Sequence, residues 1–468
     1  MVSIRTLLLC GAFALAPAGV AYAQQVQPQN LPSDDSAAAP APATAQGSKF
    51  DDAFGQAAPA PAVQPQVAAP VTVQPVPPPE PVEHWTLADA RALQAVIRGI
   101  GSEGLEPADY QPDALAQAIA AGPGADLDQV ASRSFAWLIE DLRDGRTPMS
   151  ARKQWFVVDP DPDVMPTAAV MQQALASHDV AGVVDELAPT NPDYAALRKL
   201  LAATPAKDAD KIALIRANMD RWRWLAHDLG KQYLMTNIPE YELRLTVNDK
   251  IIRTYKTIVG KPGKTATPQL AETVENIVFN PTWTVPQSIV VGEGLGAKAL
   301  ANPAWARANG YKATKAADGT VYVVQQPGPN NSLGIVKIDM PNPHAIYLHD
   351  TPAKALFNTE KRAYSHGCIR TERALELGIT LAILGGVDKD EAVADSASGE
   401  YTKVPLAKTM PVYITYFTMG RDINGQLRKF DDIYDRDAPV LASFDQPRVA
   451  ARARMTSEKV EAIEAPGA

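Results

Sequence analysis

The chain has 468 residues, of which 46% are hydrophobic and 21% are charged, so it can build a sizeable core spread over about two to three domains. Its formal net charge is −9, with 44 Lys and Arg against 53 Asp and Glu. Because contacts to phosphates need a surplus of basic residues, this balance argues against nucleic acid as a partner. The two cysteines, Cys10 and Cys368, are too few for a disulfide scaffold or a four-cysteine zinc ribbon.

The first 23 residues have the layout of a secretory signal peptide. Arg5 gives a positive start, residues 7–16 form an apolar run, and small residues flank Tyr22 at Ala21 and Ala23. The apolar run is shorter than the roughly 20 residues that a membrane-spanning helix needs. We therefore expect export of the chain and cleavage after Ala23.

Two segments are predicted to be disordered. Residues 24–83 hold 13 of the chain's 40 prolines, mixed with Ala, Gln and Val, and cannot bury enough apolar surface to offset the entropy of ordering. We interpret them as a linker, either a tether with a function or a simple spacer. Residues 446–468 are interpreted as a charged, disordered tail.

Residues 84–205 are predicted to form a small helical domain. Thr86 can cap a first helix, and a second covers about residues 127–142 and ends at Gly145. In the first helix four apolar residues recur at helical spacing: Leu93, Val96, Ile97 and Ile100. Further helices are expected near residues 166–177, 193–203 and 209–229. The domain shows no charged cluster and no cofactor motif, so the sequence assigns it no chemistry.

Residues 206–445 are predicted to form a second domain, which becomes rich in β-strands from Tyr233. Residues 241–247 and 251–259 alternate apolar and polar side chains on either side of a turn, which predicts a hairpin. Further strands are expected at residues 274–279, 321–325, 334–339, 345–349 and 412–417. Short strands separated by Gly and Pro turns indicate a mostly antiparallel sheet.

The residues that can carry chemistry are Ser365-His366-Gly367-Cys368 and, nineteen residues before the cysteine, His349. We expect His349 to end a strand and Cys368 to precede an apolar helix that Thr371 can cap, with Ala374, Leu377, Leu381 and Leu384 on it. A helix N-terminus favours the thiolate, and a neighbouring imidazole can take the thiol proton. The N–H groups of Gly367 and Cys368 could face a developing oxyanion. This set predicts acyl transfer through a cysteine.

The same residues resemble the motif of L,D-transpeptidases with the YkuD-type catalytic domain. Further stretches resemble the large YcbB-type branch of that family: Asn218–Leu225, Val259–Pro262, Phe279–Trp283, Pro327–Asn330 and Leu348–Pro352. Residues 84–205 are similar to the helical scaffold domain of that branch. One departure is that residues 193–212 leave no room for the peptidoglycan-binding domain usually inserted between the two parts.

The resemblance implies an α+β multidomain protein, with a helical scaffold domain and a mostly-β catalytic domain whose insertion at about residues 286–314 is a lid. It also implies a periplasmic enzyme that acts on peptidoglycan stem peptides without a cofactor or a metal. Cys368 would attack a tetrapeptide at the carbonyl before its terminal D-alanine, releasing D-alanine. An amine of a second stem would then form a 3→3 cross-link. Carbapenems and related β-lactams would acylate Cys368 as covalent inhibitors.

Roles for individual residues follow from the same resemblance. His349 would be the base, and His366 and Gly367 would form the oxyanion side together with Cys368. Ser365 would hold the loop. Three further residues would contact the substrate: Arg370, which could orient the loop or a substrate carboxylate, and Tyr347 and Trp283, in the pocket wall.

Other interpretations remain open at this point. Water could replace the second stem, giving a carboxypeptidase, or the amine could belong to an outer-membrane protein that becomes attached to the wall. The chain could also be a non-catalytic, wall-binding scaffold. A zinc site formed by His344, His349, His366 and Cys368 is disfavoured, because the usual ligand spacings are absent. The glycines at 292, 294 and 296 fit a lid hinge better than a dinucleotide-binding loop.

Overall fold

The computed structural model describes residues 81–248, 250–450 and 452–460. The predicted signal peptide and residues 24–80 of the predicted linker lie outside the described residues. Among the described helices, none has both the length and the apolar composition that a membrane span requires.

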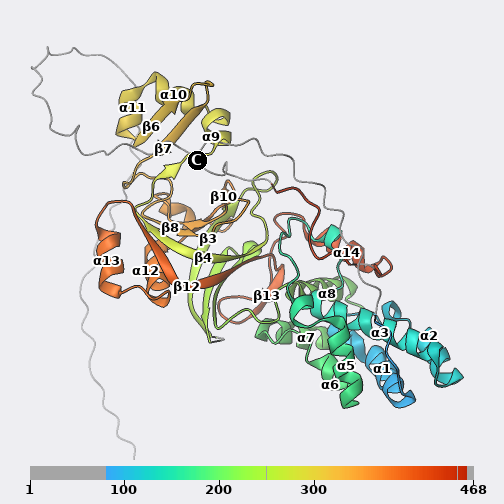
Figure 1. The fold of residues 1–468 in the computed structure, drawn as a ribbon. Helices are drawn as coiled ribbons and strands as arrows, with labels where there is room; N and C mark the ends of the chain where they lie inside the picture. Colours follow the sequence, from blue (N-terminus) through green and yellow to red (C-terminus); the bar gives the residue numbers. More distant parts are fainter. Residues whose placement is uncertain (1–80, 249, 451, 461–468) are drawn as a thin grey trace, which may run out of the picture. The chain divides into compact units, whose positions relative to one another are not determined.

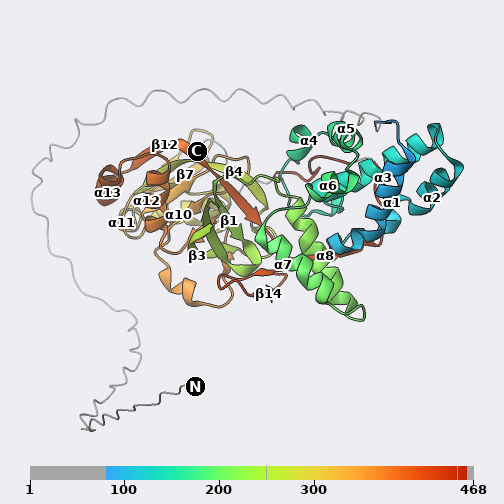
Figure 2. The same ribbon diagram turned by 90° about the horizontal axis from the view of Figure 1, so that it is seen from below.

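The N-terminal part is helical, as predicted. α1 (Leu87–Gly99) starts where Thr86 accepts a hydrogen bond from the Asp89 amide, and α3 (Ala125–Asp144) ends at Gly145. Figures 1 and 2 both show α1, α2 and α3 packed side by side. The other helices of this helical region are α2 (Pro112–Ala121), α4 (Asp161–Val164), α5 (Thr167–Ser177), α6 (Val180–Asp185) and α7 (Pro192–Ala203). Trp85 and Phe135 lie in its core.

Contrary to the sequence analysis, the helical region contains a charged cluster. The buried carboxylate of Asp141 lies 3.1 Å from Nε of Arg448 and 2.7 Å from Nη1 of Arg452. Nη2 of Arg454 lies 2.6 Å from Oδ2 of Asp163. The cluster could not be seen in the sequence because its acidic and basic members lie roughly 300 residues apart.

The same contacts correct the prediction of a disordered tail for residues 446–450 and 452–460, while residues 461–468 of that tail lie outside the described residues. Residues 446–450 and 452–460, which we call the C-terminal segment, lie against the helical region instead. They follow α14 (Asp437–Phe444), which packs on α8 (Ala209–Arg223). The charges of Arg448, Arg452 and Arg454 suggested a solvated tail, but these side chains bind carboxylates of the helical region.

The helix α8 connects the helical region to the sheet, and it ends six residues earlier than predicted, at Arg223 rather than at residue 229. The Asp220 carboxylate accepts hydrogen bonds from the amides of Arg146 and Thr147 and from the indole of Trp224. The ring of Trp222 stacks on Phe417, with centroids 4.5 Å apart. Both tryptophans are buried packing residues.

The second part is a nine-stranded mixed sheet that closes on itself. Its strands are β1 (Gln232–Asn237), β2 (Glu242–Val247), β3 (Lys250–Gly260), β4 (Leu270–Phe279), β8 (Val336–Asp339), β9 (Leu348–His349), β10 (Ala363–Ser365), β11 (Ile369–Thr371) and β12 (Thr402–Thr415). Their order is β10-β3-β11-β9-β8-β4-β12-β1-β2, and β2 also pairs with β3, which closes the ring. The pairing of β2 with β3 is the predicted hairpin, and most neighbours are antiparallel.

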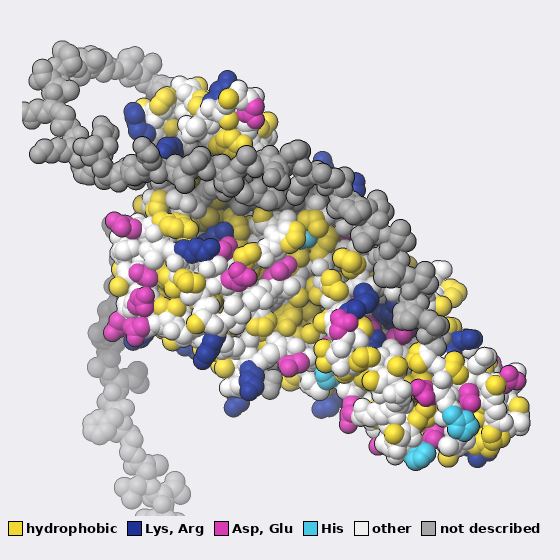
Figure 3. Space-filling view, in the orientation of Figure 1, with side chains coloured by type: hydrophobic (Ala, Val, Ile, Leu, Met, Phe, Trp, Pro, Cys, Tyr) yellow, Lys and Arg dark blue, Asp and Glu magenta, His cyan; other side chains and the backbone are white. Residues whose placement is uncertain are grey.

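Two helices, α12 (Ala374–Leu384) and α13 (Lys389–Ala397), cover the sheet on one side. Leu377 and Leu381 of α12 lie in the core of the sheet domain. Acidic side chains gather over α13 on the outer surface (Figure 3). A smaller two-stranded sheet, β13 (Met419–Arg421) with β14 (Leu427–Lys429), follows β12.

The helix predicted after Cys368 is present as α12, but the prediction that Thr371 caps it, and so brings its N-terminus next to Cys368, is wrong. Residues 369–371 form β11, which pairs with both β3 and β9, and α12 begins only at Ala374. The Thr371 hydroxyl has no hydrogen-bond partner. Two neighbouring strands hold this stretch extended, so the helix N-terminus lies several residues away from Cys368.

The predicted insertion is a separate subdomain, and it is longer than expected. It contains α9 (Gln287–Gly292), α10 (Leu295–Ala301), α11 (Pro303–Ala308) and a sheet of β5 (Trp283–Thr284), β7 (Val321–Gln325) and β6 (Tyr311–Lys315). We call residues 283–325 the lid; Figure 1 shows it as a unit beside the main sheet. Four buried residues form its own small core: Val285, Ile289, Val290 and Val323. The strand predicted at 321–325 therefore belongs to the lid.

Candidate active site

A cavity of about 380 Å³ lies between the lid and the end of the main sheet. The sheet domain contributes eight residues to it: Ser332, Leu333, Tyr347, His349, Ser365, His366, Cys368 and Arg370. The lid contributes Trp283, Pro286, Ile289, Glu293, Leu295, Lys298, Trp305 and Tyr311. All the sequence-predicted site residues except Gly367 therefore line one cavity.

The register of β9 and β11 explains why the reactive side chains share a face. These strands are parallel, with Ile369 opposite Leu348 and Arg370 opposite His349. Leu348 and Ile369 point into the core, so the residues that alternate with them point the other way, into the cavity. Cys368 joins this face because it lies two residues before Arg370.

His349 carries a buried, neutral imidazole. Its Nδ1 lies 2.5 Å from the carbonyl oxygen of Asp350, which can only accept, so Nδ1 carries the proton and Nε2 keeps its lone pair. Burial first, and then the nearby charges of Arg370 and Lys337, lower the pKa of His349 to about 3, against the opposing effect of the hydrogen bond to Asp350. The imidazole is therefore uncharged at neutral pH, with Nε2 unprotonated.

Cys368 is half-buried, and it is the single cysteine among the described residues. Its thiol donates to the carbonyl oxygen of Ala345, with Sγ and oxygen 3.6 Å apart. Ala345 has a φ of 53°, a left-handed conformation that is uncommon for a residue with a side chain. The thiol thus points along the cavity wall near β9.

Ser365 holds the loop that carries the cysteine. Its Oγ donates to the carbonyl oxygen of Cys368 at 2.6 Å and accepts from the amide of Gly367 at 3.1 Å. Thr267 supports the loop from the other side, since its hydroxyl donates to the carbonyl oxygen of Gly367 at 2.7 Å. Gly367 has a φ of 125°, which favours glycine.

This geometry disagrees with the expected role of Gly367. In the conformation observed, its N–H is bound by Ser365 and does not face the cavity as an oxyanion donor. His366 also differs from expectation, because its Nε2 lies 3.2 Å from Oε1 of Glu293 in the lid. Its side chain is 39% exposed and connects the cysteine loop to the lid.

Residues 231–381 match the family model described as the L,D-transpeptidase catalytic domain, and residues 83–201 match the model described as the scaffold domain. The chain carries an L,D-transpeptidase catalytic domain. The predicted fold class, a helical scaffold region followed by a mostly-β domain of the YkuD type, is thereby confirmed.

Relatives with known names agree with the family match. A putative L,D-transpeptidase of Haemophilus influenzae is 30% identical over 222 residues, which is 44% of this chain and 45% of that protein. The match thus spans less than half the length of this curated relative. The solved catalytic domain of an Enterococcus faecium L,D-transpeptidase is 16% identical over 40% of this chain and 99% of its own, with a TM-score of 0.21. An L,D-transpeptidase from Mycobacterium smegmatis is 13% identical, over 40% of this chain and 58% of its own, with a TM-score of 0.20. Similarity this low says nothing further about activity.

Arg370 stands out among the residues that line the L,D-transpeptidase cavity. It makes no ion pair with any described residue, and its buried Nε has no hydrogen-bond partner. Burial lowers the pKa of Arg370, and the neighbouring Cys368 partly opposes this. A guanidinium without a carboxylate partner can bind a carboxylate of a ligand.

Two supporting residues were missed by the sequence analysis. Thr267 and Glu293 contact the cysteine loop from 100 and roughly 70 residues away, and neither has a distinctive sequence neighbourhood. His344, considered as a metal ligand, packs its ring against Phe156 with centroids 4.1 Å apart. The described residues contain no group of three or more His, Cys, Asp or Glu placed to bind a metal ion.

Proposed function

We propose that this protein is a periplasmic peptidoglycan L,D-transpeptidase of the YcbB-type branch, with Cys368 as the nucleophile. The observation that carries the proposal is the neutral, buried imidazole of His349. It shares a cavity with a half-buried thiol, on the strand next to β11. The match of residues 83–201 to the scaffold domain supports the branch.

The first half-reaction forms an acyl-enzyme. The Cys368 thiol gives its proton to Nε2 of His349, and the sulfur forms a bond to the carbonyl carbon of the third residue of a tetrapeptide stem. The tetrahedral intermediate collapses with cleavage of the amide bond. The imidazolium returns the proton to the departing amine of D-alanine, and a thioester on Cys368 remains.

The second half-reaction joins two stems. The side-chain amine at the third residue of another stem attacks the thioester carbonyl and loses a proton to His349. The C–S bond then breaks, and the imidazolium returns that proton to the sulfur of Cys368. A 3→3 cross-link results. The oxyanion donors would come from the backbone N–H groups of His366 and Cys368, while Ser365 keeps the N–H of Gly367 and so holds the loop.

The substrate side of the cavity has three proposed contacts. Arg370 would bind a carboxylate of the stem, since its guanidinium has no carboxylate partner among the described residues. Tyr347 and Trp283 would form the wall on the sheet side and the lid side. β-Lactams such as carbapenems would acylate Cys368 by the same attack.

A product assay tests the proposal. Mature protein is incubated with disaccharide-tetrapeptide, and the products are analysed by mass spectrometry. Cross-linked dimer with release of D-alanine supports the proposal, whereas disaccharide-tripeptide alone indicates water as the acceptor. Absence of turnover together with absence of a carbapenem adduct would favour the non-catalytic scaffold. Cys368→Ala is the control, and it should form no product.

Two further parts of the proposal need their own tests. Attachment of an outer-membrane protein would appear as a wall-linked peptide that is lost in cells carrying Cys368→Ala. Export would be supported if the mature protein, isolated from the periplasm, starts at Gln24. A cytoplasmic protein with an intact N-terminus would contradict it.

A further inference from the structure

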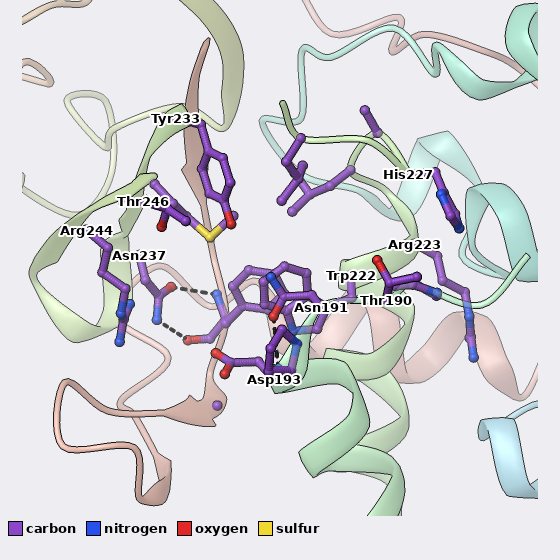
Figure 4. Close-up of a pocket in the computed structure, with 18 of the residues that line it drawn as sticks. Thr190, Asn191, Asp193, Trp222, Arg223, His227, Tyr233, Asn237, Arg244 and Thr246 are labelled. Atoms are coloured by element: carbon purple, nitrogen blue, oxygen red, sulfur yellow. Dashed lines mark hydrogen bonds between the residues drawn. The ribbon is translucent and has the colours of Figure 1, made fainter. Parts of the chain in front are cut away.

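A second cavity, of about 410 Å³, lies away from the catalytic one and shares no lining residue with it. It is bounded by the segment before α7, by the end of α8 with the loop that follows, and by β1 and β2 (Figure 4). Its size lies within the range of roughly 300–1,000 Å³ that is typical of small-molecule sites. Neither the sequence analysis nor the proposed chemistry gives it a role.

The walls of this cavity include several aromatic side chains. Trp222 and Phe417, whose rings stack on each other, both line it. Tyr233 points its hydroxyl into it from β1 (Figure 4). Phe430 lines it as well. Such side chains offer flat, apolar faces with a polar edge.

The positive charges around the cavity are already neutralised. Four arginines line it, and each has a carboxylate partner. The pairs are Arg143 with Asp144 at 2.7 Å, Arg223 with Asp220 at 3.5 Å, Arg244 with Glu240 at 2.7 Å, and Arg421 with Asp193 at 2.5 Å. The cavity therefore has no spare arginine for a phosphate or a carboxylate, which sets it apart from the catalytic cavity with Arg370.

Hydrogen-bonding capacity remains, however. Oε2 of Glu240 and Nε2 of His227 are buried without a hydrogen-bond partner, and the Glu240 side chain is only 6% exposed. Both residues line the cavity. Buried polar atoms of this kind usually have partners, so a bound group that both donates and accepts would satisfy them. Thr190, Asn191 and Thr246 add uncharged polar side chains around the cavity (Figure 4).

We propose that this cavity binds a neutral saccharide, namely one N-acetylated disaccharide unit of the glycan strand. Aromatic faces and uncharged hydrogen-bonding groups suit a ring that has apolar C–H faces and hydroxyls. The lactyl carboxylate of such a unit is converted to an amide when a stem peptide is attached, so the ligand is neutral. The inference rests on the proposed function, and it gives this chain a glycan site in place of the missing inserted domain.

Neighbouring residues of β3 provide a matched pair of variants. Ile251 lines the cavity and is 52% exposed, whereas Ile252 is 40% exposed and does not line it. Replacing an exposed side chain in this way leaves folding nearly unchanged. Ile251→Lys brings a long, charged side chain to the cavity, while Ile252→Lys adds the same charge beside it.

The experiment measures binding of chitotetraose, a neutral N-acetylglucosamine oligomer, by titration calorimetry. Every protein carries Cys368→Ala, so the catalytic thiol plays no part. We expect Ile251→Lys to weaken binding at least tenfold and Ile252→Lys to leave it within twofold. Equal affinities in the two variants, or no binding to the parent chain, would overturn the inference.

A second measurement separates this inference from the proposed function. Chains with Cys368 restored are assayed with a tetrapeptide that lacks sugar. Turnover without chitotetraose binding would refute the glycan site and leave the transpeptidase proposal standing. Binding without turnover of any stem peptide would refute the transpeptidase proposal instead.

Discussion

Acidification should destabilise this protein through His349. The pKa of the buried imidazole is about 3, against an ordinary value of 6.5. Between these two pH values the unfolded chain binds a proton that the folded chain does not, so the free energy of unfolding falls as the pH falls. The loss is about 1.4 kcal/mol per pH unit below 6.5. From pH 7.5 to 5.0 it amounts to about 2 kcal/mol.

Other titrating groups raise the free energy of unfolding as the pH falls. The prediction therefore compares how this free energy changes with pH in the wild type and in His349→Gln. Burial raises the pKa of Glu242 and of Glu272 to about 7, and protonation of these carboxyls favours the folded state as the pH falls from 7 towards 4.5. They are present in every variant, and their contribution cancels. His349→Gln keeps a donor for the Asp350 carbonyl but does not titrate.

Urea unfolding at pH 7.5 and pH 5.0 gives the free energies needed. The wild type should lose about 2 kcal/mol more than His349→Gln over this interval. His84→Gln is the control, because His84 is an exposed histidine whose ion pair is worth at most about 1 kcal/mol. If wild type and His349→Gln respond equally to pH, the imidazole is not a buried neutral base and the reasoning fails.

Three other predictions concern the loop, the lid and the C-terminal segment. Ser365→Ala removes two hydrogen bonds within the cysteine loop, worth about 1 kcal/mol each. Carbapenem acylation, measured by intact mass, should therefore slow by roughly tenfold or more. An unchanged acylation rate would show that Ser365 does not hold the loop. Glu293→Gln removes the charge that faces His366, and KM for disaccharide-tetrapeptide should rise more than kcat falls. An effect on kcat alone would mean that the contact serves chemistry rather than closure of the lid. Arg452→Gln removes one charged partner of the Asp141 carboxylate, which keeps Arg448, and thermal unfolding should report a loss of about 2 kcal/mol. A loss below about 0.5 kcal/mol would show that the segment is not held by this pair.

Local features of the fold were predictable from the sequence because they depend on neighbouring residues. The cap at Thr86, the end of α3 at Gly145 and the hairpin of β2 with β3 all follow from side chains within a few positions of one another. The motif around Cys368 and its distance from His349 were equally visible. The parallel pairing of β9 and β11 then brings both residues to one cavity.

The features that the sequence analysis missed depend on contacts between distant residues. Thr371 looked like a helix cap, but pairing of β11 with two other strands keeps this stretch extended. The C-terminal arginines looked solvated because the carboxylate of Asp141 is roughly 300 residues away. The sequence suggested that the N–H of Gly367 could bind an oxyanion, but in the structure this N–H donates a hydrogen bond to Oγ of Ser365. No local pattern reports such partners.

The most direct test of the account is to trap the acyl-enzyme. Protein is mixed with disaccharide-tetrapeptide, quenched in acid within the first turnover, and analysed by intact mass and peptide mapping. We predict a mass increase equal to the donor minus D-alanine, located on the peptide that contains Cys368 and missing in Cys368→Ala. Cross-linked product formed by the Cys368→Ala protein, or an adduct mapped to a different residue, would contradict the central claim.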